Sequence, residues 1–161
     1  MAGFGVVGEI TTGFPGYDSI IRKENGTLGE ILKANGYATS WFGKNHNVAD
    51  WESTQAGPFD RWPTGMGFEK FYGFLGGVAN NWRPALFDGT TPIDPHVGKH
   101  NYNLDFDLAD QAIAWIQMQK TVAPEKPFLA YIAPGAIHAP QHAKPEWIAK
   151  YVQFQKRRIG Q

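Results

Sequence analysis

The stretch from Thr27 to His46, TLGEILKANGYATSWFGKNH, constrains the fold of this chain more than any other. Thr27 and Glu30 have the spacing of a capping box, in which each side chain binds the other residue's backbone N–H, and apolar residues then recur at helical spacing. Gly36 predicts the end of this helix, because a residue without a Cβ adopts the left-handed conformation at little cost. The sequence therefore predicts a helix over residues 27–35.

A buried strand is predicted directly after this helix. The residues of Tyr37–Phe42 are aromatic, β-branched or small, which suits a strand that is covered on both faces of a parallel sheet. Gly43, Lys44 and His46 follow at its carboxyl end, and Lys44 and His46 point the same way if the chain there is extended. In open α/β sheets this end of the strands is the edge at which ligands bind.

A second unit of helix followed by strand lies further along the chain. Apolar residues recur there at four-residue spacing (Leu104, Leu108, Ala112 and Ile116), and Ala109, Ile113 and Trp115 widen the predicted apolar face. They predict a helix from Leu104 to about Lys120 with Asn103 as its N-cap, and the apolar run Phe128–Ala133 has the length of a strand. Two such units predict an α/β fold with a largely parallel sheet, in which strands near 37–43 and 128–134 are parallel and the helices near 27–35 and 104–120 pack on it.

The remaining segments give weaker predictions. Residues 68–74 fit a short strand, residues 85–87 and 90–93 fit a hairpin, and a third helix is predicted to start at Pro145. Residues 1–26 and 44–67 are rich in glycine or proline and fit loops.

The composition limits the classes of function. A chain of 161 residues has the size of one domain, and its 15 basic and 15 acidic residues leave no net charge, which argues against general binding to nucleic acid or an anionic membrane. The chain contains no cysteine, which excludes a thiol nucleophile and a cysteine-ligated zinc site. No segment of it fits a signal peptide or a membrane span.

Polar residues follow both predicted strands, and they include Lys44, His46 and His138. If the strands are parallel in one sheet, these three side chains converge on the same rim. A lysine offers a fixed positive charge and a histidine offers an N–H donor or a proton, which together suit a tetrahedral oxyanion such as sulfate or phosphate. The alternative is that each of them is a solvated loop residue.

Two further clusters have a metal-binding and a structural interpretation. Asp105, Asp107 and Asp110 resemble a calcium cluster without the spacing of an EF-hand, and the first turn of a helix favours acidic residues in any case. His96 and His100 have a spacing that zinc ligands use on a helix, whereas the neighbouring proline and glycine favour a loop.

The tryptophans also admit two interpretations. A wall that stacks on a sugar or an aryl group could be formed by Trp51, Trp62 and Trp82 together with Asn80, Asn81 and Arg83. Equally, their rings could anchor loops to the core.

Four segments resemble known sequence motifs. GYATSWFGKNH (36–46) resembles the GY-x-T-x-x-x-GK-x-H signature of type I sulfatases in the alkaline phosphatase superfamily, and FLAYIAPGAIHAPQHAKPEWIAKY (128–151) resembles their later strand and His-Ala-Pro substrate loop. GFPGYDSI (13–20) and QAGPFDRWPTGMGFEKFYGF (55–74) resemble the bacterial arylsulfatase branch. The resemblance covers nearly all of residues 3–152 and implies a partial sulfatase-like fold.

The resemblance also implies roles for the polar residues. Residues that match Lys44 and His46 contact the sulfate and a formylglycine nucleophile, and the histidine that matches His138 contacts the ester and is expected to protonate the leaving group. The implied activity is that of an arylsulfatase, a sulfuric ester hydrolase with a small sulfate ester as substrate. A phosphatase or phosphonate hydrolase of the same superfamily is the alternative enzyme, and a non-catalytic fragment or interaction module is the alternative of another class.

The chain departs from the family pattern at the nucleophile and at the metal. It contains no Cys/Ser-x-Pro-x-Arg motif. The aspartates and the asparagine that hold calcium in the family are also absent, and Asn45 and Asn47 do not replace these ligands. We therefore expect residues 1–161 to be a single-domain, internal part of a sulfatase catalytic domain. Calcium is expected in the full-length family member and not in this chain, which is predicted to be inactive alone.

Two expectations concern the surroundings of the chain. An incomplete sheet exposes an edge or an apolar face, which favours self-association. Members of the family are often periplasmic or secreted, but the sequence itself assigns no compartment.

Overall fold

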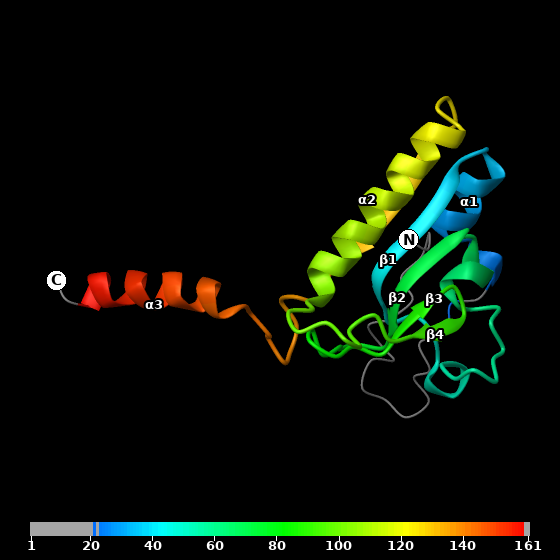
Figure 1. Cartoon of the computed structure of the whole chain (residues 1–161). Helices are drawn as coiled ribbons and strands as arrows, with labels where there is room; N and C mark the ends of the chain where they lie inside the picture. Colours follow the sequence, from blue (N-terminus) through cyan, green and yellow to red (C-terminus); the bar gives the residue numbers. More distant parts are fainter. Residues whose placement is uncertain (1–20, 22, 160–161) are drawn as a thin grey trace.

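A computed structural model describes residue 21 and residues 23–159, with side chains up to residue 152 (Figure 1). The predicted loop character of residues 1–20 lies outside this range. The helices are α1 (Leu28–Ala34), α2 (Leu104–Val122) and α3 (Pro145–Ile159), with short 3-10 turns at Lys23–Asn25, Asp50–Glu52 and Pro63–Met66. The strands are β1 (Ala38–Asn45), β2 (Lys70–Leu75), β3 (Leu86–Asp88), β4 (Thr91–Ile93) and β5 (Phe128–Ala133).

The five strands form one mixed sheet in the order β4-β3-β2-β1-β5. β1 lies in the middle of the parallel part, with Phe42 beside Tyr72 of β2 and beside Ile132 of β5. β2, β3 and β4 are antiparallel neighbours, so residues 86–93 form the predicted hairpin. The predicted α/β fold with parallel strands near 37–43 and 128–134 is confirmed.

β1 continues through Lys44 to Asn45, beyond the predicted strand end at Phe42. Gly43 explains the difference, because its φ of +105° and the nearness of β5 both require glycine: an added Cβ would lie 2.1 Å from the carbonyl oxygen of Ala133. A glycine that permits close strand packing cannot be told from a strand terminator in the sequence.

α1 begins and ends as the sequence predicts. Glu30 N–H donates to the Thr27 hydroxyl, and Thr27 N–H donates to the Glu30 carboxylate, which completes the capping box. The Thr27 hydroxyl also donates to the carbonyl oxygen of Met66 at 2.5 Å, which ties the helix start to the loop before β2. Gly36 follows the helix with a φ of +85°.

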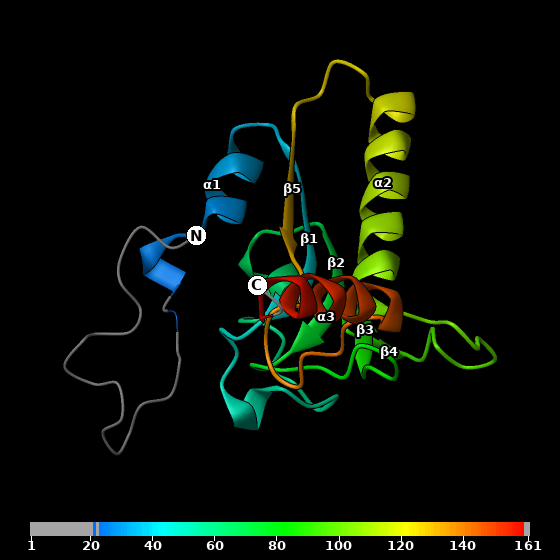
Figure 2. The same cartoon turned by 90° about the vertical axis from the view of Figure 1, so that its left-hand side faces the viewer.

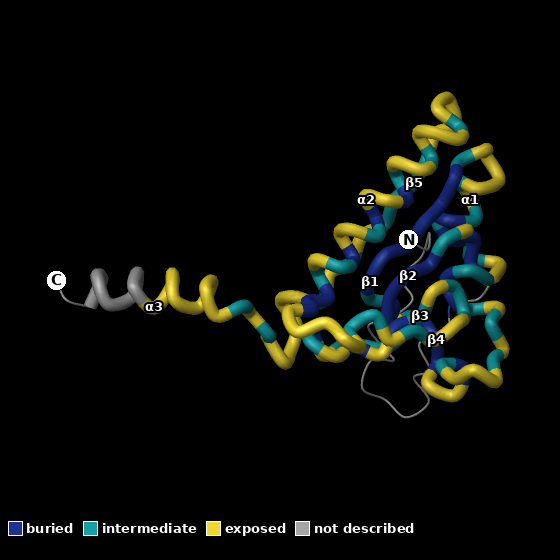
Figure 3. Tube along the Cα trace, viewed as in Figure 1, coloured by how far each residue is buried: buried dark blue, intermediate teal, exposed yellow. Residues whose placement is uncertain are grey.

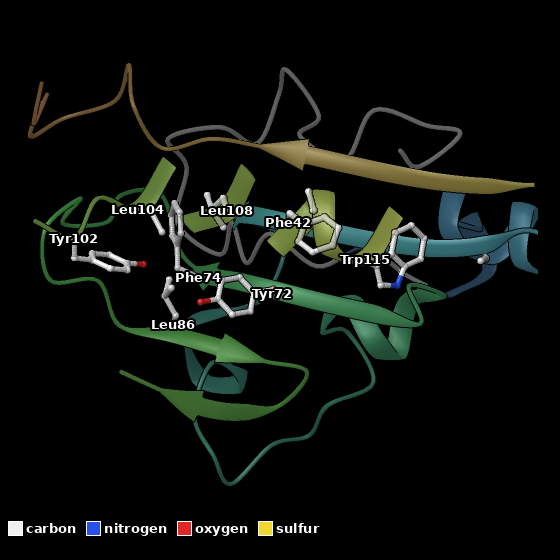
Figure 4. Close-up of a cluster of buried hydrophobic side chains, with 10 residues drawn as sticks. Phe42, Tyr72, Phe74, Leu86, Tyr102, Leu104, Leu108 and Trp115 are labelled. Atoms are coloured by element: carbon white, nitrogen blue, oxygen red, sulfur yellow. The ribbon is translucent and has the colours of Figure 1, made fainter. Parts of the chain in front are cut away.

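α2 covers one face of the sheet (Figure 4) and is capped by Asn103, whose side chain accepts from Phe106 N–H. Buried residues of α2, the sheet and the preceding loop form one cluster there: Ala38, Phe42, Tyr72, Phe74, Leu86, Tyr102, Leu104, Leu108, Ala112 and Trp115. The predicted apolar face is wrong at Ala109 and Ile113, which are both exposed, Ile113 to 52%. The narrow sheet covers only one stripe of α2, and Trp115 fills the last position of that stripe.

Aromatic residues also fill the opposite face of the sheet, where Trp41, Phe68 and Phe71 are buried together. Trp62 is fully buried, donates its indole N–H to the carbonyl oxygen of Glu52, and packs edge-to-face on Phe87. For Trp62 the loop-anchoring interpretation is therefore correct. Figure 3 shows the resulting pattern, with buried central strands and an exposed outer side of α2.

α3 starts at Pro145, as predicted, and extends away from the sheet (Figures 1 and 2). Its apolar residues Trp147, Ile148 and Tyr151 are at least half exposed. Among the described residues, no helix combines the length and the hydropathy that crossing a membrane requires.

Candidate functional site

The carboxyl end of β1 is held in place by hydrogen bonds at Lys44 and Asn45. The Trp41 indole N–H donates to the Lys44 carbonyl oxygen at 3.0 Å. Asn45 is buried, its side-chain oxygen accepts from Asn47 N–H at 2.8 Å, and its carbonyl oxygen accepts from Gly76 N–H at 2.7 Å. The backbone that carries Lys44 and His46 is therefore fixed to the segment that follows β2.

The ring of His46 lies against Gly77 in that segment. A Cβ added to Gly77 would come within 3.1 Å of the His46 ring, so the glycine leaves room for the imidazole. The His46 side chain is exposed, and Lys44 is half-buried next to Phe74 in the strand register. Both side chains are thus accessible to a ligand at the carboxyl edge of the sheet.

His138 lies in the loop that follows β5. A turn forms around it, because its N–H donates to the Gly135 carbonyl oxygen at 3.1 Å and its own carbonyl oxygen accepts from Gln141 N–H at 2.9 Å. The imidazole is exposed, with its Nδ1 3.3 Å from the Ala139 carbonyl oxygen. The peptide bond between Ala139 and Pro140 is cis.

Asp105 and Asn81 fix this loop to the rest of the sheet edge. One carboxylate oxygen of Asp105 accepts from Gly135 N–H at 3.0 Å, and the other accepts from the Asn81 side chain at 3.4 Å. Asn81 N–H donates to His142 Nδ1 at 3.3 Å, so the loop is held at both ends. The sequence signalled Asp105 only as part of an acidic cluster, and it gave no sign of the Asn81 and His142 contacts.

The structure places the three predicted residues at one edge of the sheet. Gly43 pairs with Ala133, so the segment with Lys44 and His46 and the loop with His138 leave the sheet side by side. The described contacts include none between His138 and Lys44 or His46, so a shared ligand stays a prediction. None of the three forms an ion pair with a described residue, which leaves their charge and donors available to an anion.

The acidic cluster at the start of α2 has a structural use instead of the calcium-binding one. Asp107 accepts hydrogen bonds from the hydroxyls of Tyr72 at 2.6 Å and Tyr102 at 2.8 Å. Burial, followed by the hydrogen bond to Asp107 and its charge, raises the pKa of both tyrosines far above the ordinary value. Asp105 is occupied by Gly135 and Asn81.

The described residues do not fit a metal centre. Within the described ranges, no three histidine, aspartate or glutamate side chains lie close enough together to hold an ion. His96 and His100 lie in the turns between β4 and α2 and not on a helix, so the geometry needed for the zinc alternative is missing. The described residues therefore offer no group of three carboxylate or imidazole side chains around which a metal site could form.

Comparisons with known proteins place these residues in a family. The sequence matches the family model described as Sulfatase over residues 4–160. Ps i-CgsB, solved in complex with k-i-k-neocarrahexaose, resembles the chain with a TM-score of 0.65 and 23% identity over 81% of this chain and 31% of that chain. PsFucS1 sulfatase from Pseudoalteromonas sp. resembles it with a TM-score of 0.53 and 19% identity over 76% of this chain and 29% of that chain. The similarity to these structures concerns the fold, and the chain spans about a third of their length.

Proposed function

Because the chain belongs to the sulfatase family, we propose that Lys44, His46 and His138 bind the sulfate group of a sulfate ester, and that the enzyme containing them is an arylsulfatase. The observation that carries this proposal is the register of β1 and β5. Gly43 lies beside Ala133, so the two segments with the three side chains leave the sheet at the same edge. That edge is where open α/β sheets bind their ligands.

Each side chain has a distinct task in this proposal. The Lys44 ammonium group supplies a fixed positive charge to the sulfate oxygens, and His46 donates an N–H to the same group. His138 donates a proton to the oxygen of the leaving alcohol or phenol. Hydrogen bonds hold the backbone of both segments in advance, so little reorganisation is needed when the anion binds.

For the 161-residue chain alone, we propose that it binds sulfate but does not hydrolyse a sulfate ester. The family resemblance implies a formylglycine residue and a divalent cation, which would supply the covalent nucleophile and the Lewis acid for sulfate ester cleavage. This chain contains no cysteine and no Ser-x-Pro-x-Arg motif, and its described residues do not fit a calcium cage. Lys44, His46 and His138 can supply only charge stabilisation and a proton. These contributions alone leave most of the activation barrier of sulfate ester hydrolysis, which exceeds ~10 kcal/mol, in place.

The test measures binding and turnover on the same protein. Isothermal titration with inorganic sulfate is expected to show weak binding that Lys44→Ala reduces by about tenfold or more. Lys33→Ala, which removes an exposed lysine of α1, should leave that binding unchanged and serves as the matched control. A parallel titration with inorganic phosphate probes the phosphatase alternative, which tighter phosphate binding would favour.

The turnover assay uses p-nitrophenyl sulfate with calcium present. No product above background is expected from the wild-type chain. Turnover that Lys44→Ala abolishes would contradict the proposed inactivity, and sulfate binding that ignores Lys44→Ala would contradict the proposed site.

A further inference from the structure

Asp105, in the first turn of α2, is connected to the backbone of His138 through a single residue. One carboxylate oxygen of Asp105 accepts from Gly135 N–H at 3.0 Å, and Gly135 lies two residues after the end of β5. The carbonyl oxygen of Gly135 accepts in turn from His138 N–H at 3.1 Å. The carboxylate therefore holds the turn that carries the imidazole of His138.

The same carboxylate binds Asn81, which fixes the other end of this loop. The side-chain amide of Asn81 donates to Asp105 at 3.4 Å, and its backbone N–H donates to His142 Nδ1 at 3.3 Å. Asn81 is buried, and its carbonyl oxygen accepts from Leu104 N–H at 2.8 Å. The ring of Trp82 stacks on that of His142 with an interplanar angle of 18°. Both ends of the loop after β5 are thus held by the start of α2 and by the segment after β2.

The segment after β2 also contacts the other half of the proposed site. Gly76 N–H donates to the carbonyl oxygen of Asn45 at 2.7 Å, and Gly77 lies against the ring of His46. Asn81 follows only five residues after Gly76. One short stretch of backbone is therefore bonded to the end of β1 on one side and to the loop after β5 on the other, which fixes the two histidine-bearing segments relative to each other.

Two effects of Asp105 on a bound anion have opposite signs. By its charge alone, a carboxylate near an anion weakens binding, so its removal would strengthen binding. By its hydrogen bonds, it holds the loop that carries His138, so its removal would weaken binding. Gly135 N–H and the Asn81 amide are both donors, and an ionised carboxylate can accept from both at once. The sign of the change in affinity therefore shows which effect dominates.

We propose that Asp105 is a positioning residue, which holds the loop of His138 where the imidazole meets a sulfate bound by Lys44 and His46. Asn81 completes the connection, because it joins the same carboxylate to the segment that contacts His46. This inference rests on the proposed function and adds to it a residue that does not itself contact the sulfate. An acidic side chain in the first turn also favours the helix, so the test has to separate positioning from stability.

The test is a ¹H–¹⁵N NMR titration of the 161-residue chain with inorganic sulfate. The amides of His46 and Gly77 report on one half of the proposed site and the amide of His138 on the other, and all are expected to shift with one affinity. Asp105→Ala should weaken that affinity by about threefold or more and reduce the shift at His138. Asp105→Asn also lacks the charge but keeps an oxygen that can accept from Gly135 N–H, so it should recover most of the loss.

A double variant shows whether Asp105 acts through His138. His138→Ala alone is expected to weaken sulfate binding by a similar factor to Asp105→Ala. The double variant Asp105→Ala/His138→Ala should then bind sulfate as His138→Ala does, because the effects of residues that act through one contact are not additive. Asp110→Ala removes an exposed carboxylate from the same helix, should leave the affinity unchanged, and serves as the matched control. Asn81→Ala removes the other partner of the carboxylate and should reproduce the loss if Asp105→Ala does not fold.

The outcomes separate this inference from the proposed function. Sulfate binding that Lys44→Ala weakens, but that Asp105→Ala leaves unchanged or strengthens, would overturn the positioning role alone. Additive losses in the double variant would overturn it as well, because Asp105 would then act independently of His138. A wild-type chain that binds no sulfate would overturn the proposed function and the positioning role with it. Unchanged amide signals away from the sheet edge would verify that each variant keeps its fold.

Discussion

Asp107 joins two tyrosines that lie far apart in the sequence. Tyr72 comes from β2 and Tyr102 from the loop before α2, and both hydroxyls donate to the same carboxylate oxygen. Burial, the hydrogen bond and the negative charge of Asp107 all favour the neutral phenol, which is why the pKa of each tyrosine is raised. The protonated pair thus stabilises the contact between α2 and the sheet.

We expect the free energy of unfolding to decrease as the pH rises above about 10. In the unfolded chain Tyr72 and Tyr102 lose their protons near that pH, whereas the folded chain retains them because both pKa values are raised. Their contribution is therefore complete below pH 10 and is lost as the pH rises further, since the unfolded state then binds fewer protons. Urea unfolding at a series of alkaline pH values measures this slope.

Phenylalanine variants identify the source of the slope. Tyr72→Phe/Tyr102→Phe should flatten it, by up to about 1.4 kcal/mol per pH unit for each tyrosine removed. Tyr151→Phe removes a phenol that is 67% exposed and should not change it. A double variant with the wild-type slope would show that other groups control alkaline unfolding.

For single residues, the sequence predicts which polar side chains lie at the sheet edge better than it predicts which residues those side chains contact. Lys44 and His46 could be assigned to the sheet edge because they follow a recognisable strand, and the structure places them there. The network of Asn81, Asp105 and His142 could not be predicted, because its contacts join residues 24 to 61 positions apart. Polar side chains in loops carry no periodicity that would reveal such partners.

At the start of α1, the Thr27 hydroxyl makes both a local and a long-range hydrogen bond. The Thr27 hydroxyl caps the helix through Glu30 N–H and also donates to Met66 in the loop before β2. The capping box was predictable from spacing alone, whereas the bond to Met66 depends on the packed loop.

We expect Thr27→Ala to lower the free energy of unfolding by about 1–2 kcal/mol, because it removes the cap and leaves the buried Met66 carbonyl without this donor. Thr27→Ser keeps the hydroxyl and should recover most of that loss. Thr121→Ala is the matched control, since its hydroxyl bonds Gln117 on an exposed part of α2. Urea unfolding followed by circular dichroism measures all three, and equal losses in Thr27→Ala and Thr27→Ser would rule out the capping explanation.

For the whole molecule, the order of helices and strands was sufficient to predict the fold class. Two units of helix followed by strand led to parallel β1 and β5, and the structure confirms this arrangement. The sequence did not reveal that β2 and β1 pair in parallel, or that α3 extends away from the sheet (Figure 1), because both depend on tertiary packing. The exposed Ile113 of α2 was missed for the same reason.

The two edges of the sheet differ in how well they are protected. Within the described residues, β4 and β5 each have a strand on one side only. β4 is three residues long and contains Pro92, which lacks an N–H, so it is a poor template for pairing. β5 is longer and has the sequence FLAYIA, with neither a charge nor a proline. Its open edge therefore favours pairing with a second copy of the chain.

We expect this chain to form dimers as its concentration rises, with β5 of one copy against β5 of the other. Ile132 is 48% exposed on β5, and Ile132→Lys should weaken the dimer because a lysine at a strand edge opposes pairing. Ile113→Lys places the same charge on the outer side of α2, where Ile113 is 52% exposed, and should not weaken it. Sedimentation velocity over a range of concentrations measures the effect. A monomer at every concentration would contradict the prediction, and equal weakening by both variants would place the contact elsewhere than β5.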